Sequence, residues 1–283
     1  SKIIAKGDNP DILVMTATPI PRTLALILYG DLDISIIDEL PPNRKKIQTY
    51  AVGKNYDERV NNFIKEQLSK GRQAYIVCPL VEEEKPEIKV DEKTGEQYID
   101  LKATNTVNLK SVEKLTEDYE KILNGYNVVC LHGKMKSKEK DDIMERFKNG
   151  EIDVLVSTTV IEVGVDVPNA TVMVILDADR FGLAQLHQLR GRVGRGEHAS
   201  TCILIASPKT EQGKQRMQIM CESTDGFYLS QKDLELRGSG DVFGLRQSGI
   251  PEFKVADIVQ DYDILEQARE DAITFIIEEE DSV

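Results

Sequence analysis

Short apolar segments alternate with amphipathic segments through the middle of the chain, and this alternation limits the folds that are possible. Six segments have the length and composition of strands: 47–52, 73–78, 127–131, 153–157, 171–176 and 201–206. Helical spacing of apolar residues occupies the stretches between them, at 55–70, 111–123, 137–148 and 183–189, with Ser111 as a plausible N-cap. Strands that alternate with helices form a parallel sheet. We therefore expect an α/β fold, a parallel sheet with helices on both faces.

The two ends of the chain depart from this pattern. Residues 11–16 and 34–39 favour strands around an apolar helix at 24–29, and Pro41 and Pro42 break the chain after them. After Pro208 the strands stop, and two helices are expected at 210–221 and 224–236, forming a helical hairpin. A glycine-rich loop follows, and a charged C-terminal helix begins near Lys254. These changes divide the chain into 1–42, 43–207 and 208–283.

One stretch inside the middle segment is charged and lies outside the alternation, at about 82–109. Its apolar runs Ile88–Val90 and Tyr98–Leu101 flank a turn that contains Gly95. This arrangement is typical of a β-hairpin. We expect an inserted hairpin whose default role is a solvated surface decoration.

Composition limits the function less than local charge does. The chain of 283 residues carries a formal net charge of −13, but the acids concentrate at 82–84, 87–100 and 278–281, whereas 132–140 and 188–195 are basic. Net charge therefore only weakly disfavours a nucleic-acid partner. No apolar run reaches the roughly 20 residues that a membrane span needs. The four cysteines form no C-x-x-C pair, and the three histidines lack neighbouring ligands, so we expect a cytoplasmic protein, no membrane and no metal site within this chain.

The run of nine residues at 188–196 holds three arginines and three glycines. Glycine lets the backbone bend sharply and approach a partner closely. Arginine presents a planar, permanently charged fork that matches phosphate oxygens. A loop of this composition at the end of a helix predicts phosphate binding, and the alternative is a basic turn on a solvated surface.

The sequence does not contain the other half of a nucleotide site. The phosphate-binding pattern G-x-x-x-x-G-K-[ST] is missing from these residues, and the stretch from Gly133 to Ser137 lacks its leading glycine. Asp38 and Glu39 follow a strand as magnesium-binding acids do. They lie after Thr16-Ala17-Thr18, however, where a helicase would have them before it. We therefore reject them as a metal site.

The pattern Q-x-x-G-R-x-G-R resembles motif VI of superfamily 2 helicases, and four further stretches resemble other motifs of that superfamily in the same order. These are 16–19 (motif III), 74–79 (motif IV), 129–135 (the motif between IV and V) and 156–168 (motif V). The resemblance implies a RecA-like lobe in which Arg192 and Arg195 are catalytic and stabilise charge on the γ-phosphate of ATP. It implies that Gln188, Gly164 and Asp166 contact the nucleotide. The residues implied for nucleic-acid binding are Thr158, Thr159, His132, Gly133 and Lys134.

Other stretches resemble one family within this group, the RecG family of branch-migrating DNA helicases. They are 15–26, 29–33, 37–42 and 225–249, the last of which is similar to the translocation motif that RecG shares with Mfd-type translocases. For that motif the resemblance implies Arg216, Arg237, Arg246 and Gln247. Arg216 as a solvated helix residue is the alternative. An Mfd-type transcription-repair coupling translocase and a non-enzymatic nucleic-acid-binding module are the competing functions.

By this resemblance the chain is the second motor lobe and translocation motif of a helicase, with residues 1–42 as a remnant of the first lobe. ATP and Mg²⁺ would lie between the lobes of the full-length enzyme, with the Mg²⁺ site in the missing lobe, and none is expected to bind here. The implied partners are branched DNA, the missing first lobe and an N-terminal wedge domain. We expect the fragment alone to lack ATPase activity, its arginine loop to be exposed, and residues 1–40 to support self-association.

Overall fold

The computed structural model describes residues 45–79, 88–90, 97–99, 101–158 and 166–237, together with 13, 35, 37, 264, 267, 268, 271, 272, 274 and 275. Only the backbone is described for 88–90, 97–99, 101–111 and 237. The elements expected at 11–16, 24–29 and 34–39, and the glycine-rich loop, lie outside the described residues. The chain forms two compact units, one of residues 36–225 and one of 1–35 with 226–283.

The first unit is built on a six-stranded sheet whose strands run parallel to one another. In spatial order the strands are β1 (Gln48–Val52), β8 (Thr201–Ile205), β7 (Ala170–Ile175), β2 (Gln73–Val77), β6 (Val154–Ser157) and β5 (Val128–Leu131). All six lie where the apolar runs predicted them. The order shows that β2 returns to the centre of the sheet, between β6 and β7, which no local pattern indicates.

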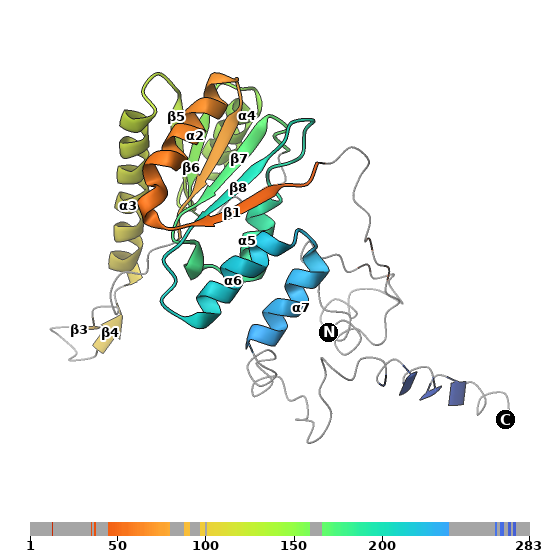
Figure 1. The fold of residues 1–283 in the computed structure, drawn as a ribbon. Helices are drawn as coiled ribbons and strands as arrows, with labels where there is room; N and C mark the ends of the chain where they lie inside the picture. The colour runs from red at the N-terminus through yellow and green to blue at the C-terminus, as the bar shows by residue number, and fades with distance from the viewer. Residues whose placement is uncertain are drawn as a thin grey trace, which may run out of the picture. The chain divides into compact units, whose positions relative to one another are not determined.

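Helices cover both faces of this sheet, with α2 and α3 on one face and α4 and α5 on the other (Figure 1). Their bounds, with the short 3₁₀ helices η2 and η3, are η2 (Lys54–Tyr56), α2 (Asp57–Ser69), α3 (Leu101–Ile122), α4 (Ser137–Lys148), η3 (Ala178–Arg180), α5 (Leu183–Arg190) and α6 (Glu211–Glu222). Helix α7 (Gly226–Arg237) belongs to the second unit. The predicted α/β class is confirmed.

Alternation along the strands explains how both faces are filled. On β2, Ala74 and Ile76 join the core beneath α2 and α3, where Ile64 and Leu123 are fully buried. Tyr75 points to the opposite face, and its ring meets Phe147 of α4 edge-on with centroids 4.9 Å apart. Successive side chains of a strand point to opposite faces. A continuous apolar run is therefore what a strand covered on both sides requires.

The insertion contains the expected hairpin but ends earlier than predicted. Strands β3 (Ile88–Val90) and β4 (Gln97–Ile99) pair antiparallel. The helix that follows starts at Leu101, so the predicted start with Ser111 as N-cap is wrong, and Ser111 lies inside α3. Thr104, Asn105 and Thr106 are weak helix formers and hid this start, but no glycine or proline interrupts 101–111. Propensity is a weak prior that neighbouring structure overrides.

The helices expected after Pro208 are present as α6 and α7. Thr210 caps α6, its hydroxyl accepting a hydrogen bond from the Gly213 amide. The described residues between 264 and 275 are helical, as expected of the charged C-terminal segment. Among the described helices, none is long and apolar enough to cross a bilayer.

Candidate functional site

The predicted nucleic-acid residues lie where two neighbouring strands end. Leu131 of β5 is in register with Ser157 of β6, so His132 and Thr158 follow at adjacent strand ends. Ligands of parallel α/β sheets bind outside the carboxyl ends of the strands. Gly133 and Lys134 continue from His132 and are exposed. The structure therefore brings His132, Gly133, Lys134 and Thr158 together at the carboxyl ends of the strands. Thr159 lies outside the described residues.

Several buried polar atoms at these strand ends have no hydrogen-bond partner in the described part of the chain. They are the His132 Nδ1, Ser157 Oγ and Thr158 Oγ1 atoms. A buried polar group without a partner costs about 1–3 kcal/mol. Three such groups at the end of two adjacent strands favour a site in which a ligand or water completes the bonding.

The predicted catalytic residues Arg192 and Arg195 and the predicted ATP-binding residue Asp166 come together around residues 188–196, here called the arginine–glycine loop. The Arg195 Nε atom donates to the Gly191 carbonyl at 3.0 Å and lies 3.7 Å from the Asp166 Oδ1 atom. Arg192 is half-buried, and both this burial and the neighbouring Arg195 lower its pKa. Two like charges held close together are unfavourable unless an anion lies between them or nearby. The loop is thus suited to a phosphate.

A tyrosine that the sequence did not single out faces this cluster. Tyr75 is 1% exposed, and burial raises its pKa to about 12, against the opposing influence of Arg192 and Arg195. The phenol therefore stays neutral near pH 7 and adds no negative charge beside the two arginines. Its place in a buried strand concealed it, because an apolar run that contains one tyrosine predicts only core packing.

Glycine is required at two positions of the loop. Gly194 has a φ of +76°, in the left-handed region, and a Cβ atom there would lie 2.7 Å from the Ile47 Cγ1 atom. A side chain on Gly196 would collide with the Pro168 carbonyl. The loop therefore packs its backbone against the segment before β1 and against the segment that carries Asp166. This packing explains how residues far apart in sequence reach one site.

The expectation that all three arginines are exposed is wrong for Arg190, which is only 1% exposed. Its Nη1 atom donates to the Met220 carbonyl at 2.7 Å, the Ser223 carbonyl at 2.9 Å and the Thr49 hydroxyl at 3.2 Å. Burial lowers its pKa. Arginine spacing alone cannot separate a structural guanidinium from a phosphate-binding one, because both occur beside glycines.

A second arginine, Arg216 of α6, bonds to the segment just before α5. The Arg216 Nη1 atom donates to the Phe181 carbonyl at 2.8 Å, and its Nη2 atom donates to the Asp179 carbonyl at 3.2 Å. Arg216 is half-buried, so the alternative of a solvated helix residue is contradicted. Together Arg190 and Arg216 form an arginine clamp that joins α6 to both ends of the α5 segment.

The remaining predicted site residues are placed as follows. Gln188 lies on α5 and is exposed, and Arg237 ends α7, where only its backbone is described. Gly164, Arg246 and Gln247 lie outside the described residues. Within the described ranges, no group of three or more His, Cys, Asp or Glu side chains could hold a metal ion.

Comparison with known families agrees with this arrangement. The helicase conserved C-terminal domain matches residues 57–197. The C-terminal part of domain 3 of the ATP-dependent DNA helicase RecG matches residues 223–283. The chain is 55% identical over 276 residues to the ATP-dependent DNA helicase RecG of Bacillus subtilis, a match that covers 97% of this chain. The chain matches a C-terminal region of RecG helicases. The match spans only 38% of that relative, so this chain corresponds to part of the longer protein.

Two further relatives support the assignment to RecG. The enzyme of the same name from Streptococcus pneumoniae is 54% identical over 264 residues, which is 93% of this chain and 36% of the relative. A solved structure of RecG bound to a three-way DNA junction matches 88% of this chain and 30% of its own, with a TM-score of 0.66 and 41% identity. With the two family matches, these relatives indicate that the chain corresponds to a C-terminal region of RecG.

The arginine clamp predicts different roles for arginines of the same loop. We expect Arg190→Met to lower the free energy of unfolding by about 2–4 kcal/mol, because charge-assisted hydrogen bonds to a buried and a partly buried carbonyl are lost. Arg195→Met is the matched control, since Arg195 is exposed, and should change stability by less than about 1 kcal/mol. Urea unfolding followed by circular dichroism measures both. Equal losses in the two variants would contradict a structural role specific to Arg190.

Proposed function

We propose that this chain is the second motor lobe and translocation motif of an ATP-dependent DNA helicase that remodels branched DNA in recombination and repair. The observation that carries the proposal is the grouping of Arg192, Arg195 and Asp166 on a glycine-shaped loop. A phosphate-binding wall built from two arginines is incomplete as a nucleotide site. Its completion by another domain is what a two-lobed motor requires.

The residues present fit one side of a bound ATP. Arg192 and Arg195 would hold the γ-phosphate, and Asp166 and the exposed Gln188 would contact other parts of the nucleotide. ATP supplies a phosphoryl group whose transfer to water is the source of free energy. The two guanidiniums stabilise negative charge as it develops, the role of arginine fingers in other phosphoryl-transfer enzymes. Mg²⁺ and the phosphate cradle are assigned to the first lobe.

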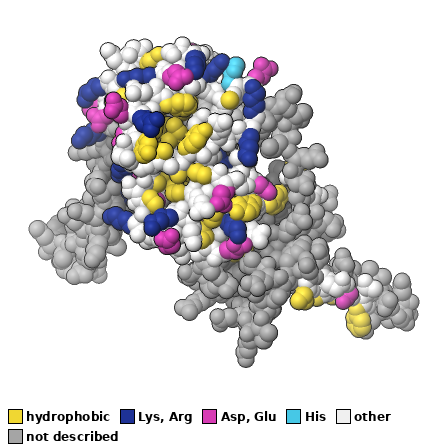
Figure 2. Space-filling view, viewed as in Figure 1, with side chains coloured by type: hydrophobic (Ala, Val, Ile, Leu, Met, Phe, Trp, Pro, Cys, Tyr) yellow, Lys and Arg dark blue, Asp and Glu magenta, His cyan; other side chains and the backbone are white. Residues whose placement is uncertain are grey.

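We assign the DNA strand to the carboxyl ends of β5 and β6, where His132, Gly133, Lys134 and Thr158 lie. Support comes from the buried polar atoms at the ends of β5 and β6 and from the exposed Lys134 beside them. The net charge of −13 does not oppose this, because acidic and basic side chains are interspersed on the face shown in Figure 2. The branched form of the DNA follows from the relative solved on a three-way junction.

The translocation motif is assigned to Arg216, Arg237, Arg246 and Gln247. Arg216 supports this assignment, since it bonds α6 directly to η3 and to Phe181, just before α5 and the arginine loop. A movement of the arginine–glycine loop during ATP turnover would therefore be transmitted to α6 through Arg216. The matched RecG-specific region at 223–283 favours this function over an Mfd-type translocase or a non-enzymatic module. The domain limits 1–42, 43–207 and 208–283, the missing wedge domain and a cytoplasmic location belong to the same proposal.

In the full-length protein, we expect Arg195→Ala to lower ATP turnover by about 10³–10⁵-fold while binding of forked DNA survives, because the charge at the γ-phosphate is lost. Arg59→Ala is the control, since Arg59 is exposed on α2 away from the loop. Phosphate release and a DNA gel shift measure the two functions. Normal hydrolysis by the Arg195 variant would remove the basis of the assignment.

The 283-residue chain by itself should hydrolyse no ATP in the presence of Mg²⁺ and forked DNA. The reason is chemical, because the chain supplies arginines but no G-x-x-x-x-G-K-[ST] loop. Phosphate release by the purified chain, with the full-length protein as positive control, measures this. Robust turnover that survives further purification would mean that the nucleotide site is complete within the chain.

Self-association through residues 1–40 remains part of the proposal. The run Leu24-Ala-Leu-Ile-Leu-Tyr29 is apolar and is assigned to a lobe from which it is separated here. An apolar helix of this kind is expected to bury itself against the same chain or another copy. Sedimentation velocity of the chain and of a version lacking residues 1–40 measures this. A monomeric chain in which this segment is rapidly cleaved by protease would refute it.

A further inference from the structure

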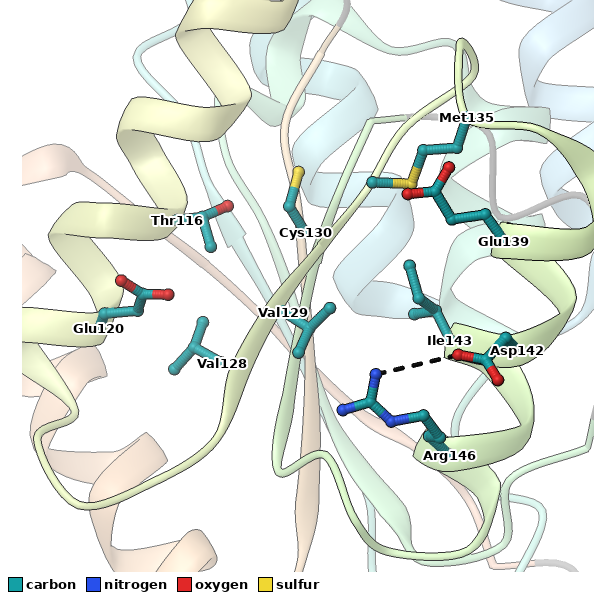
Figure 3. A pocket seen from close by; sticks show the side chains of 10 residues that line it. All are labelled: Thr116, Glu120, Val128, Val129, Cys130, Met135, Glu139, Asp142, Ile143 and Arg146. Carbon is teal, nitrogen blue, oxygen red and sulfur yellow. Dashed lines mark ion pairs between the residues drawn. The ribbon is translucent and has the colours of Figure 1, made fainter.

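The two edge strands of the sheet, β1 and β5, differ in how far neighbouring helices cover them. At the β1 edge, α6 packs against the strand. At the β5 edge, α3 and α4 stand apart on either side of the strand and leave a groove of about 460 Å³ (Figure 3). An open strand edge is a template for pairing with another chain, and proteins protect such edges with charge, proline or bulges. The four residues of β5, Val-Val-Cys-Leu, include no charged residue and no proline, and they pair with β6 without a bulge.

The hydrogen-bonding groups of β5 that face the groove follow from its pairing. The Asn127 carbonyl accepts from the Val154 amide of β6. In a parallel ladder every second residue bonds to a given neighbour. Val129 and Leu131 therefore bond to β6, whereas Val128 and Cys130 turn their amide and carbonyl groups outward. Within the described part of the chain, these two residues thus present unpaired backbone groups along the floor of the groove.

The side chains around this backbone select for one kind of occupant. Val129, Met135 and Ile143 make the central part apolar. Glu120 on α3 and Glu139 and Asp142 on α4 line its two walls, as Figure 3 shows. The one cation in the lining, Arg146, lies 3.9 Å from the Asp142 carboxylate and 3.5 Å from Glu151. The groove thus combines an apolar floor, open strand backbone and an excess of negative charge.

We propose that this β5-edge groove binds an extended basic peptide segment of a partner protein, which adds as a strand to β5. Main-chain hydrogen bonds supply affinity in strand addition, and alternate side chains supply specificity. Because alternate side chains project to opposite walls, the basic set would lie against Glu120 on the α3 side, and the apolar set would lie on Val129 and Ile143 on the α4 side. A second copy of this chain fits poorly, because pairing two β5 edges would bring the same acidic walls together. DNA is repelled by the same acids.

The location gives the interaction a consequence. The carboxyl end of β5 leads directly into His132, Gly133 and Lys134, the segment assigned to the DNA strand. A strand added along β5 would end beside that segment. A protein docked there would be held next to the DNA path without occupying it.

A fluorescently labelled hexapeptide of alternating lysine and valine, acetylated and amidated at its ends, is the probe. We expect saturable binding to the 283-residue chain below about 1 mM by fluorescence anisotropy, a limit that corresponds to about −4 kcal/mol. The same peptide N-methylated at every backbone amide keeps its charge but cannot donate the hydrogen bonds of a paired strand. It should bind at least about tenfold more weakly. Equal affinity of the two peptides, or no saturable binding, overturns the proposal.

Charge reversal at the walls provides a matched pair of variants. Glu120→Lys with Glu139→Lys should weaken binding at least about tenfold, since both residues line the groove. Glu117→Lys with Glu145→Lys changes the net charge by the same amount, at exposed positions of the same helices that do not line it. This second pair should have a much smaller effect. Equal effects of the two pairs would mean non-specific attraction and would overturn strand addition.

Cys130 reports occupancy directly, because it is half-buried in the groove, whereas Cys78 and Cys202 are buried. In a Cys221→Ser background, which removes the exposed thiol, the peptide should slow alkylation of Cys130 at least about fivefold at saturation, by occlusion of the strand edge. Binding without protection would place the peptide elsewhere and refute the site. A dimer that the peptide dissociates, seen by sedimentation, would identify a second copy as the occupant instead.

Discussion

The arrangement of the functional loop depends on one buried guanidinium. Arg190 lies at the end of α5 with 1% of its surface exposed, and it reaches carbonyls at the end of α6 and a hydroxyl on β1. A buried charge is costly unless its donors are satisfied, so the fold is stable only when α5, α6 and β1 meet in this geometry. Carbonyls at a helix C-terminus also carry partial negative charge, which favours a cation there. The clamp therefore fixes the point from which the arginine–glycine loop departs.

Beyond Arg190, the loop holds Arg192 and Arg195, which we assign to anion binding and not to packing. Gly194 permits a left-handed turn against Ile47, and Gly196 approaches Pro168 closely. Arg192 and Arg195 are thereby held near each other, and Arg195 forms a partly exposed ion pair with Asp166. Surface ion pairs of this kind are weak. The positive charge is therefore available to an anion, and the buried neutral phenol of Tyr75 does not cancel it.

The same lobe presents surfaces of opposite character around one sheet. The strand ends at β5 and β6 expose backbone and polar atoms next to Lys134, whereas the groove along the outer side of β5 is walled by acids. An edge strand is commonly protected because its free amides and carbonyls invite pairing. Here the acids exclude nucleic acid and a like-charged copy of the chain, but they leave the backbone accessible. The two surfaces are separate because they use different parts of β5. Its free backbone groups point sideways, away from β6, whereas the end of the strand leads into the segment that contains Lys134.

The sequence by itself determined the class of fold, because period and length separate buried strands from helices without any long-range information. Its resemblance to a family pattern also predicted that the arginine–glycine loop and Asp166 belong to one site, and the structure brings Arg195 and Asp166 close together. The sequence failed where the chemistry of a residue depends on distant neighbours. Ser111 looked like a helix start although the helix begins at Leu101, and Arg190 looked like its two companions in the loop. Only the tertiary structure decided which arginine is buried, that Tyr75 faces the loop, and that β5 is an open edge. Each of these properties is set by the environment of a side chain or strand, and that environment comes from segments more than 25 residues away along the chain.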